Sequence, residues 1–269
     1  MANTVFFAWQ ADTPVSDNKT FVWNALEDAL KIAFADVRPE LSPRPEVDTQ
    51  GVTGAPNIVD TIFKRIRGSS VFIADLTFVA TTARGKAIPN PNVMIELGYA
   101  ARSIGWERTI LVMNSAHGPA KNLPFDVIQH RWPIEFRVTG QTEVREKRYE
   151  KLAQALGDAI LACQASELER ATEMANSLDT STLNFVAHHA GHELIEMPLP
   201  PRTMGEHIGG IVEIGAARRL IELGAIRIRS TPDFGYVWTH DGRAMIAHFS
   251  QQHPTLLDVL RQHRAAKST

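Results

Sequence analysis

The sequence has a single cysteine, Cys163, among its 269 residues. One cysteine excludes an intramolecular disulfide and any metal centre built on several thiolates. No run approaches the roughly 18 apolar residues that cross a membrane, and the first residues, MANTVFFAWQ, lack the basic region of a signal peptide. We therefore expect a soluble, cytoplasmic protein with no membrane partner, which fits a reducing compartment.

An excess of charge of one sign is also missing. The formal net charge is -2, with 22% charged and 44% hydrophobic residues. These values are ordinary for a globular protein and provide no bulk attraction to nucleic acid or to anionic lipid. At about 150 residues per domain, the length indicates two domains. We expect a first domain over 1–142, a connecting helix over 143–178 and a second domain over 179–269.

Strands and helices alternate along the first domain. Short apolar runs predict strands, and apolar residues at helical spacing predict helices between them. The expected strands are 4–9, 45–48, 71–75, 109–114 and 132–136, and the expected helices are 20–35, 53–66 and 91–104. This alternation predicts an α/β fold of flavodoxin-like or Rossmann-like type, a parallel sheet sandwiched by helices.

The most informative stretch runs from Val71 to Ala101. VFIA is an apolar run without alternation, as in a strand buried on both faces, and it places Asp75 at the carboxyl end of that strand. The helix that follows begins near Asn92, which we expect to cap it, and carries Glu96 in its first or second turn. Open α/β sheets bind ligands beyond the carboxyl ends of their strands. The three polar side chains are therefore expected near a ligand crevice.

Glu96 has a functional and a structural interpretation. It is flanked by Ile95 and Leu97, and a carboxylate in apolar surroundings can stabilise a cationic transition state. Alternatively, Glu96 is only a favourable charge near a helix N-terminus and Asn92 only a cap. Gly98 permits a close approach of backbone or ligand.

The second domain has a different element order. STLNFVAHHAG predicts a short helix, IGGIVEIGAARRLIELGAI a longer one, IRIRSTPDFGYVWT a hairpin, and DGRAMIAHFSQQ a helix opened by Asp241. Helix, helix, two-stranded wing and helix is the order of a winged-helix module. Residues 179–269 hold nine Lys/Arg and nine Asp/Glu, so the basic excess of a DNA-binding surface is absent. We expect protein–protein packing ahead of DNA contact.

Eight of the ten histidines follow residue 187, and His188, His189 and His192 form HHAGH. His188 and His192 share a helix face, but no HExxH order is present. We therefore predict a polar surface or interface there, and no metal. GEHIGG at 205–210 matches no phosphate-binding loop and is interpreted as a helix entry.

Residues 4–138 resemble a bacterial family of TIR-like (Toll/interleukin-1 receptor-like) nucleotide-binding proteins, which are similar in their sheet and active-site layout to nucleoside 2-deoxyribosyltransferases. The order and spacing of five motifs carry the resemblance: FFAWQAD (6–12), DTQGVTGAPNI (48–58), VFIADLT (71–77), NPNVMIELGYA (90–100) and LPFD (123–126). The chain departs from the deoxyribosyltransferases in lacking an evident acceptor-base motif, and from animal TIR domains in its long loop over 78–90.

The resemblance implies an N-glycosidase in which Glu96 is the catalytic carboxylate. Its implied reaction is cleavage of the nicotinamide–ribose bond of NAD or a related nucleotide, as an effector of antiphage defence activated by assembly or by a partner. NAD would be the substrate, with no cofactor, and the second domain would hold a homo-oligomer or a defence-complex partner. The alternatives are a non-catalytic nucleotide sensor with a signalling or DNA-binding domain, and a nucleoside 2-deoxyribosyltransferase-like enzyme.

The implied chemistry is coherent because base departure develops oxocarbenium charge that a carboxylate stabilises or attacks. Nicotinamide leaves neutral, so no strong general acid is needed. Each substrate-binding role has a structural alternative. Trp9 stacks on a base or packs under the first loop, and Gln10 or Asp12 reaches the polar edge of the base, unless Asp12 is only a solvated charge. Asp75, Asn90 and Asn92 hold ribose hydroxyls, or Asp75 braces its loop and Asn92 only caps a helix, and Asp48 lies at the crevice edge or forms a turn. The expected substrate-binding residues are Trp9, Gln10, Asp12, Asp48, Asp75, Asn90 and Asn92.

Overall fold

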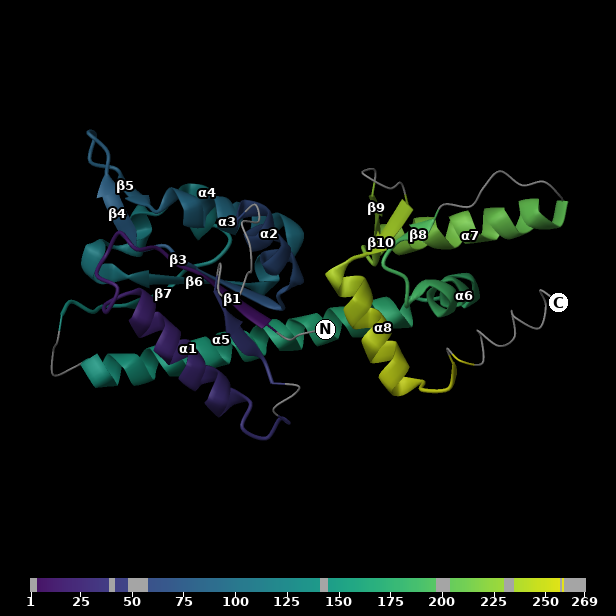
Figure 1. The fold of residues 1–269 in the computed structure, drawn as a ribbon, viewed down its shortest axis with the longest axis horizontal. Coiled ribbons are helices and arrows are strands. Elements are labelled where there is room, and N and C mark those ends of the chain that lie inside the picture. The colour runs from purple at the N-terminus through teal and green to yellow at the C-terminus, as the bar shows by residue number, and fades with distance from the viewer. Residues whose placement is uncertain are drawn as a thin grey trace. The chain divides into compact units, whose positions relative to one another are not determined.

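The computed structural model describes residues 4–38, 42–47, 58–140, 145–196, 204–229, 235–256 and 258. The chain divides into two compact units, Met1–Gln164 and Ala165–Thr269, and each is described by itself (Figure 1). The division falls within α5 (Arg145–Asn176), a single helix in the stretch where a connecting helix was expected.

The first unit contains a five-stranded sheet in the order β2-β1-β3-β6-β7. All neighbouring strands in it are parallel. The order corresponds to that of flavodoxin-like sheets, and the predicted α/β class with a parallel sheet is confirmed. The strands are β1 (Thr4–Ala8), β2 (Arg44–Glu46), β3 (Val71–Asp75), β6 (Thr109–Asn114) and β7 (Ile134–Phe136).

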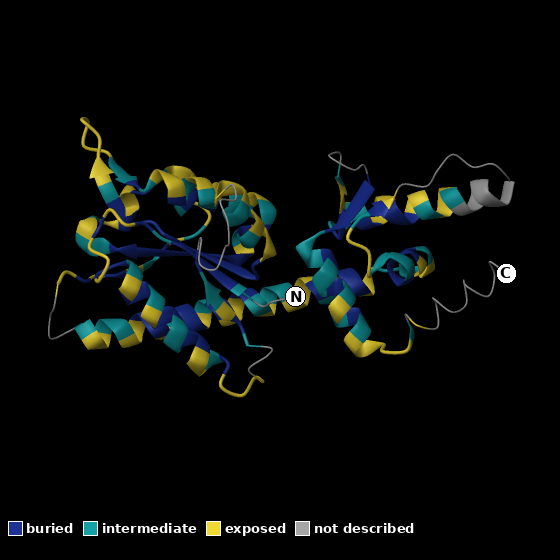
Figure 2. Ribbon diagram, viewed as in Figure 1, coloured by how far each residue is buried: buried dark blue, intermediate teal, exposed yellow. Residues whose placement is uncertain are grey.

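Helices cover both faces of this sheet (Figure 1). One face packs against α1 (Lys19–Ala33) and the first part of α5, through a cluster that includes Phe7, Ile73 and Val112. The other face packs against α2 (Ile58–Gly68), α3 (Pro91–Ser103) and α4 (Phe125–Ile128), through a cluster that includes Phe72. Successive strand side chains thus enter opposite layers, which explains the apolar runs without alternation. Figure 2 shows the strands buried and the helices exposed on their outer sides.

Short elements follow several strands. The segment over 78–90, expected as a loop, instead forms an antiparallel hairpin of β4 (Phe78–Thr81) and β5 (Ala87–Pro89). Its turn places Gly85 at φ +79°, a conformation that favours glycine. Single 3-10 turns lie at Trp106–Arg108, Ser115–His117 and Ala120–Asn122.

The second unit has its own core, formed by the last part of α5 and by α6 (Thr180–His189), α7 (Met204–Glu222) and α8 (His240–Gln252). Three antiparallel strands complete it in the order β8-β10-β9: β8 (Ile195–Glu196), β10 (Gly235–Trp238) and β9 (Ile226–Arg229). The expected helices and hairpin are present, whereas β8 was not predicted. Thr239, not Asp241, caps α8, since its side chain accepts the Gly242 N–H.

Among the helices of the described residues, none combines the length and the apolar character needed to cross a lipid bilayer.

Candidate functional site

The polar side chains of the first unit gather at the carboxyl ends of β1, β3 and β6. The β1–α1 loop (residues 9–18) leaves β1 at this edge, and Asp75 and Asn114 are the last residues of β3 and β6. In this strand order the chain turns to opposite sides of the sheet after β1 and after β3, and ligands of such sheets bind at that switch point. The topology therefore places the candidate site between these two strand ends.

Asp75 lies in the interior with no exposed surface. Its Oδ1 accepts hydrogen bonds from the Thr77 backbone N (3.0 Å) and hydroxyl (2.5 Å). Its Oδ2 accepts from Asn18 Nδ2 (3.3 Å) and Gln10 Nε2 (3.5 Å). Burial raises the pKa of Asp75, and these hydrogen bonds oppose that shift. Both oxygens are engaged within the protein, so the geometry favours the bracing role over contact with ribose.

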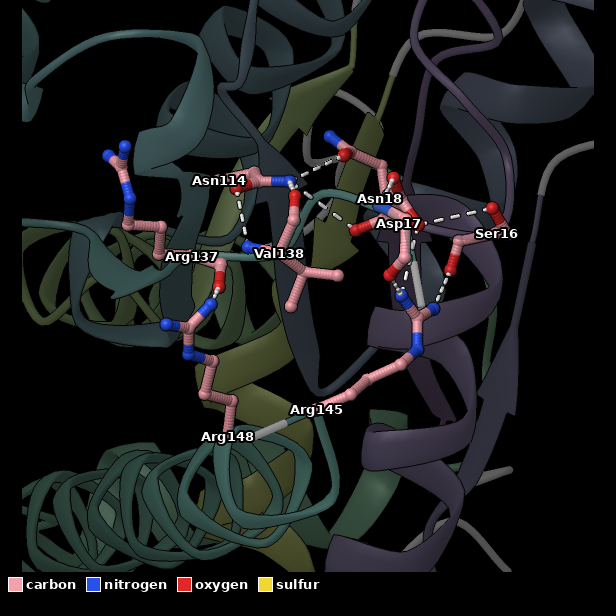
Figure 3. Close-up of polar contacts among 9 residues, drawn as sticks. Ser16, Asp17, Asn18, Asn114, Arg137, Val138, Arg145 and Arg148 are labelled. Carbon is pink, nitrogen blue, oxygen red and sulfur yellow. Dashed lines mark hydrogen bonds and ion pairs between the residues drawn. The ribbon is translucent and has the colours of Figure 1, made fainter. Parts of the chain in front are cut away.

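Backbone groups determine the orientation of the amides around Asp75. Asn114 Oδ1 accepts from the backbone N of Ala116 and of Val138, both at 3.1 Å. Asn114 Nδ2 therefore donates, to the Val138 carbonyl (2.8 Å) and to Asn18 Oδ1 (3.0 Å). Asn18 Nδ2 is consequently turned toward Asp75, as a donor. Figure 3 shows the part of this hydrogen-bond network around Asn114.

Gln10 is held in the same way at the start of the loop. Its Oε1 accepts from the backbone N of Asp12 (2.6 Å) and of Thr13 (3.1 Å), and its Nε2 donates to Thr13 Oγ1 (2.6 Å). Gln10 is 3% exposed, so this side chain shapes the loop from within. A contact between Gln10 and the edge of a base is not part of this geometry.

Trp9 is half-buried beside the core of the α1 face. The Lys19 Nζ atom lies 3.4 Å from the centroid of its ring, a cation–π contact that occupies one face of the indole. Trp9 Nε1 is buried and has no hydrogen-bond partner in the described part of the chain. This arrangement corresponds to packing under the loop, the structural alternative for Trp9.

Asp12 and Asn90 connect the β1–α1 loop with the helix that carries Glu96. Asn90 Nδ2 donates to Asp12 Oδ2 at 2.6 Å. Asn90 Oδ1 accepts from the backbone N of Asn92 (2.9 Å) and Val93 (3.2 Å), so Asn90 is the N-cap of α3. The expectation that Asn92 caps this helix was wrong: Asn92 lies inside it and is exposed.

Glu96 is half-buried in the second turn of α3. The buried stripe of the helix is formed by Val93, Leu97 and Ala100, so Glu96 borders the core. Asn92, four residues earlier, lies on the same face as Glu96. Outside its own helix turn, no atom of the described residues would lie within 4 Å of a Cβ added at Gly98, so none of their backbone approaches it closely. Asp48, the remaining candidate, lies outside the described residues.

A second set of contacts lies at the end of the β1–α1 loop (Figure 3). Asp17 Oδ1 pairs with Arg145 Nη1 at 3.0 Å, and its Oδ2 accepts the Gly140 N–H at 2.7 Å. Burial acts to raise the pKa of Asp17, but the bonds from Gly140 and Arg145 outweigh it, and the net shift is downward. Asp17 and Arg145 were not predicted from the sequence.

In the described ranges, no group of three His, Cys, Asp or Glu side chains is placed to bind a metal ion. His189 Nε2 lies 2.9 Å from Glu213 Oε1, which pairs α6 with α7. His188 Nδ1 lies 2.9 Å from the Asn184 carbonyl of its own helix. HHAGH thus serves contacts within the second unit.

No protein-family model matches the chain, and no curated protein matches it. Among solved structures, it is similar to a 2-desoxiribosyltransferase from Leishmania mexicana, with 24% sequence identity and a TM-score of 0.28. The match covers 42% of this chain and 65% of the Leishmania chain. A likeness this low supports no conclusion about activity, and membership of the TIR-like family stays a prediction.

Proposed function

We propose that the first unit is an enzyme that breaks the N-glycosidic bond of a nucleoside or nucleotide, with Glu96 as the catalytic carboxylate. The observation that carries the proposal is the Asp12–Asn90 hydrogen bond. It connects the loop that leaves β1 at the switch point of the sheet with the N-cap of the helix that bears Glu96. A ligand bound at that point would lie between this loop and α3.

The accessible groups suit a sugar and a developing positive charge. Asp12 and Asn92 are exposed and offer a carboxylate and an amide for hydroxyl groups. Glu96 borders the apolar side of α3, where a carboxylate acts more strongly on an oxocarbenium-like transition state than it does in water. Asp75 is assigned to the support of the loop, because it is buried and fully engaged.

NAD is the first substrate to test, since its nicotinamide leaves as a neutral base and needs no strong acid. The same carboxylate would serve hydrolysis, with water as acceptor, or transfer, with a second base as acceptor. The proposal therefore includes both NAD hydrolysis in antiphage defence and deoxyribosyl transfer. The two reactions are distinguished by their products, since hydrolysis releases a base without an added acceptor and transfer yields a nucleoside with an exchanged base.

The experiment incubates full-length protein with NAD and with a panel of ribo- and 2′-deoxyribonucleosides, with and without an added free base. Mass spectrometry then measures released base and exchanged nucleoside. The variants are Glu96→Gln and, as a matched control, Glu150→Gln on exposed α5 surface. We expect Glu96→Gln to lower turnover by about 100-fold or more. Its melting temperature should stay within about 2 °C, because glutamine keeps the size of the half-buried Glu96 side chain and one of its two acceptor oxygens.

Three results would contradict the proposal or the role of Glu96 in it. Wild-type protein that binds a nucleotide but releases no base, at every concentration and in every assembled form tested, would be a sensor. Equal turnover by wild type and Glu96→Gln would remove Glu96 from the chemistry. Unfolding of Glu96→Gln, with Glu150→Gln intact, would assign Glu96 a structural role.

For the second unit we propose a winged-helix-like interaction module that pairs with another copy or with a partner protein. The order α6, β8, α7, β9, β10, α8 and the antiparallel sheet β8-β10-β9 support it. Sedimentation of the full chain tests self-association. Duplex binding that weakens steeply with salt would favour DNA instead.

A further inference from the structure

The β1–α1 loop is anchored at its far end by two adjacent residues with different partners. Asn18 reaches into the buried network, where it bonds to Asp75 and Asn114. Asp17 turns the other way, to Arg145 and Gly140. Figure 3 shows Asp17 between Asn18 and the Arg145 guanidinium. The loop end is therefore attached both to the sheet and to the first residue of α5.

Arg145 forms a dense set of contacts around this loop end. Besides Asp17, its guanidinium donates to the Gly140 carbonyl (2.9 Å) and to the Ser16 carbonyl. Its Cζ lies 5.0 Å from the centroid of the Phe21 ring in α1. The Arg145 side chain is 20% exposed and that of Asp17 is 8% exposed. Water therefore competes little for the part-buried bond between Arg145 and Asp17, and charge-assisted bonds of this kind are the strong ones.

Gly140 completes the arrangement from the segment after β7. It has φ +59°, in the left-handed region, and both its N–H and its carbonyl contact the pair formed by Asp17 and Arg145. The loop end thus meets Gly140 and Arg145, which lie 123 and 128 residues after Asp17 in the chain, at one ion pair. A residue with a single donor could not replace the planar guanidinium at all three acceptors.

We propose that the Asp17–Arg145 ion pair sets the position of the β1–α1 loop at the candidate active site, and that Asp17 and Arg145 are positioning residues. The loop bears Asp12, which bonds to the N-cap of the Glu96 helix. Releasing its far end lets Asp12 move relative to α3, without altering any group proposed to touch substrate. The effect on catalysis rests on the proposed function, whereas the effect on the loop does not.

The test uses full-length protein and four variants. Arg145→Ala removes the guanidinium, Arg145→Lys keeps its charge but loses the fork, and Asp17→Asn removes the carboxylate charge. Arg148→Ala is the matched control, because Arg148 lies in the first turn of the same helix and donates to the Arg137 carbonyl instead of to the loop. Melting curves establish that each variant is folded.

Hydrogen exchange of the unliganded protein is the first readout. We expect Arg145→Ala and Asp17→Asn to lose protection in residues 9–18, Arg145→Lys to lose part of it, and Arg148→Ala to keep it. Protection equal to wild type in folded Arg145→Ala would overturn the inference, whether or not the protein proves to be an enzyme. If Arg145→Ala fails to fold, Arg145→Lys and Asp17→Asn decide by the same criterion.

Turnover is the second readout, on whichever substrate wild type cleaves. We expect kcat to fall about 10- to 100-fold in Arg145→Ala, as for a displaced substrate-contacting group. Arg145→Lys should recover part of the loss, and Arg148→Ala should match wild type. Lost protection with unchanged kcat would overturn the catalytic part of the inference. Absence of turnover in wild type would instead count against the proposed function, with the exchange result unaffected.

Discussion

Replacing Asp75 by asparagine tests the buried network most directly, because the change is nearly isosteric. Asp75 accepts from four donors, two on each oxygen. Asparagine has one acceptor oxygen and one NH₂ group. If the oxygen keeps the two short bonds from Thr77, the NH₂ group faces Asn18 Nδ2 and Gln10 Nε2, which are themselves donors. The Asn18 amide cannot rotate in response without breaking its bond from Asn114.

The expected cost follows from counting the polar atoms left without partners. Gln10 Nε2 keeps its bond to Thr13 Oγ1, so two donors are orphaned: Asn18 Nδ2 and the new Nδ2 at position 75. Each buried orphan costs about 1–3 kcal/mol. The variant also removes a carboxylate whose pKa is raised by burial, which offsets part of the cost. We expect a net loss of about 2–4 kcal/mol in the free energy of unfolding.

Urea unfolding near pH 7 measures this difference, and thermal melting should show a drop of about 4–16 °C for a unit of this size. Asp36→Asn, at an exposed acid, is the control and should change stability by less than about 0.5 kcal/mol. A loss that small for Asp75→Asn would refute the reasoning, because it would mean that the amides around position 75 reorient freely.

The second unit, the end of the β1–α1 loop and the N-cap of α3 each provide a further prediction. Gly242→Ala should destabilise the second unit by about 3 kcal/mol or more, because the added Cβ would lie 2.0 Å from the Ala225 carbonyl oxygen. Gly98→Ala should instead raise the free energy of unfolding by about 0.5–1 kcal/mol, because alanine is the better helix former. Equal effects of the two substitutions in urea unfolding would contradict these contacts. The Asp17 pKa is lowered from 3.8 in the folded protein, so the stabilising contribution of Asp17 is present above that value and is lost as the pH falls through the lowered pKa. The free energy of unfolding of Asp17→Asn should therefore fall less steeply with decreasing pH than that of wild type. Asn90→Asp should keep the cap of α3 but repel Asp12, so the free energy of unfolding should change by less than about 0.5 kcal/mol while residues 9–18 lose exchange protection. Asn90→Ala removes the cap and should lower the free energy of unfolding by about 1 kcal/mol.

The order of elements in the first unit could be predicted from the sequence because its strands are short apolar runs buried on both faces. Val71–Asp75 and Thr109–Asn114 were located at their observed bounds. The hairpin over 78–89 could not be predicted in this way, because a glycine in its middle and prolines at its end are equally typical of a loop. The signal that could have found it is the β-prone FVAT run before a turn with Gly85.

The candidate site was predicted less well, for a physical reason. Sequence pattern places Asp75 at a strand end, but its burial depends on Asn18, which is 57 residues away in the chain. Asn114 carried a usable signal, as the polar end of a buried strand at the same sheet edge as Asp75. The sequence carries no comparable signal for Asp17, because its partner Arg145 lies 128 residues later in the chain.

Exposure divides the polar residues at this sheet edge into two groups with different consequences for substitution. The buried group holds the loop and the strand ends together, and consists of Gln10, Asn18, Asp75, Thr77 and Asn114. The accessible group consists of Asp12, Asn92 and Glu96. Because buried members have their hydrogen-bonding capacity engaged, their loss should lower stability first and turnover as a consequence. Loss of an accessible member, which lies outside this buried network, should lower turnover more than stability. Asn90 is half-buried and takes part in both effects, since its Oδ1 caps α3 and its Nδ2 holds Asp12. Its variants therefore separate the two effects within a single side chain.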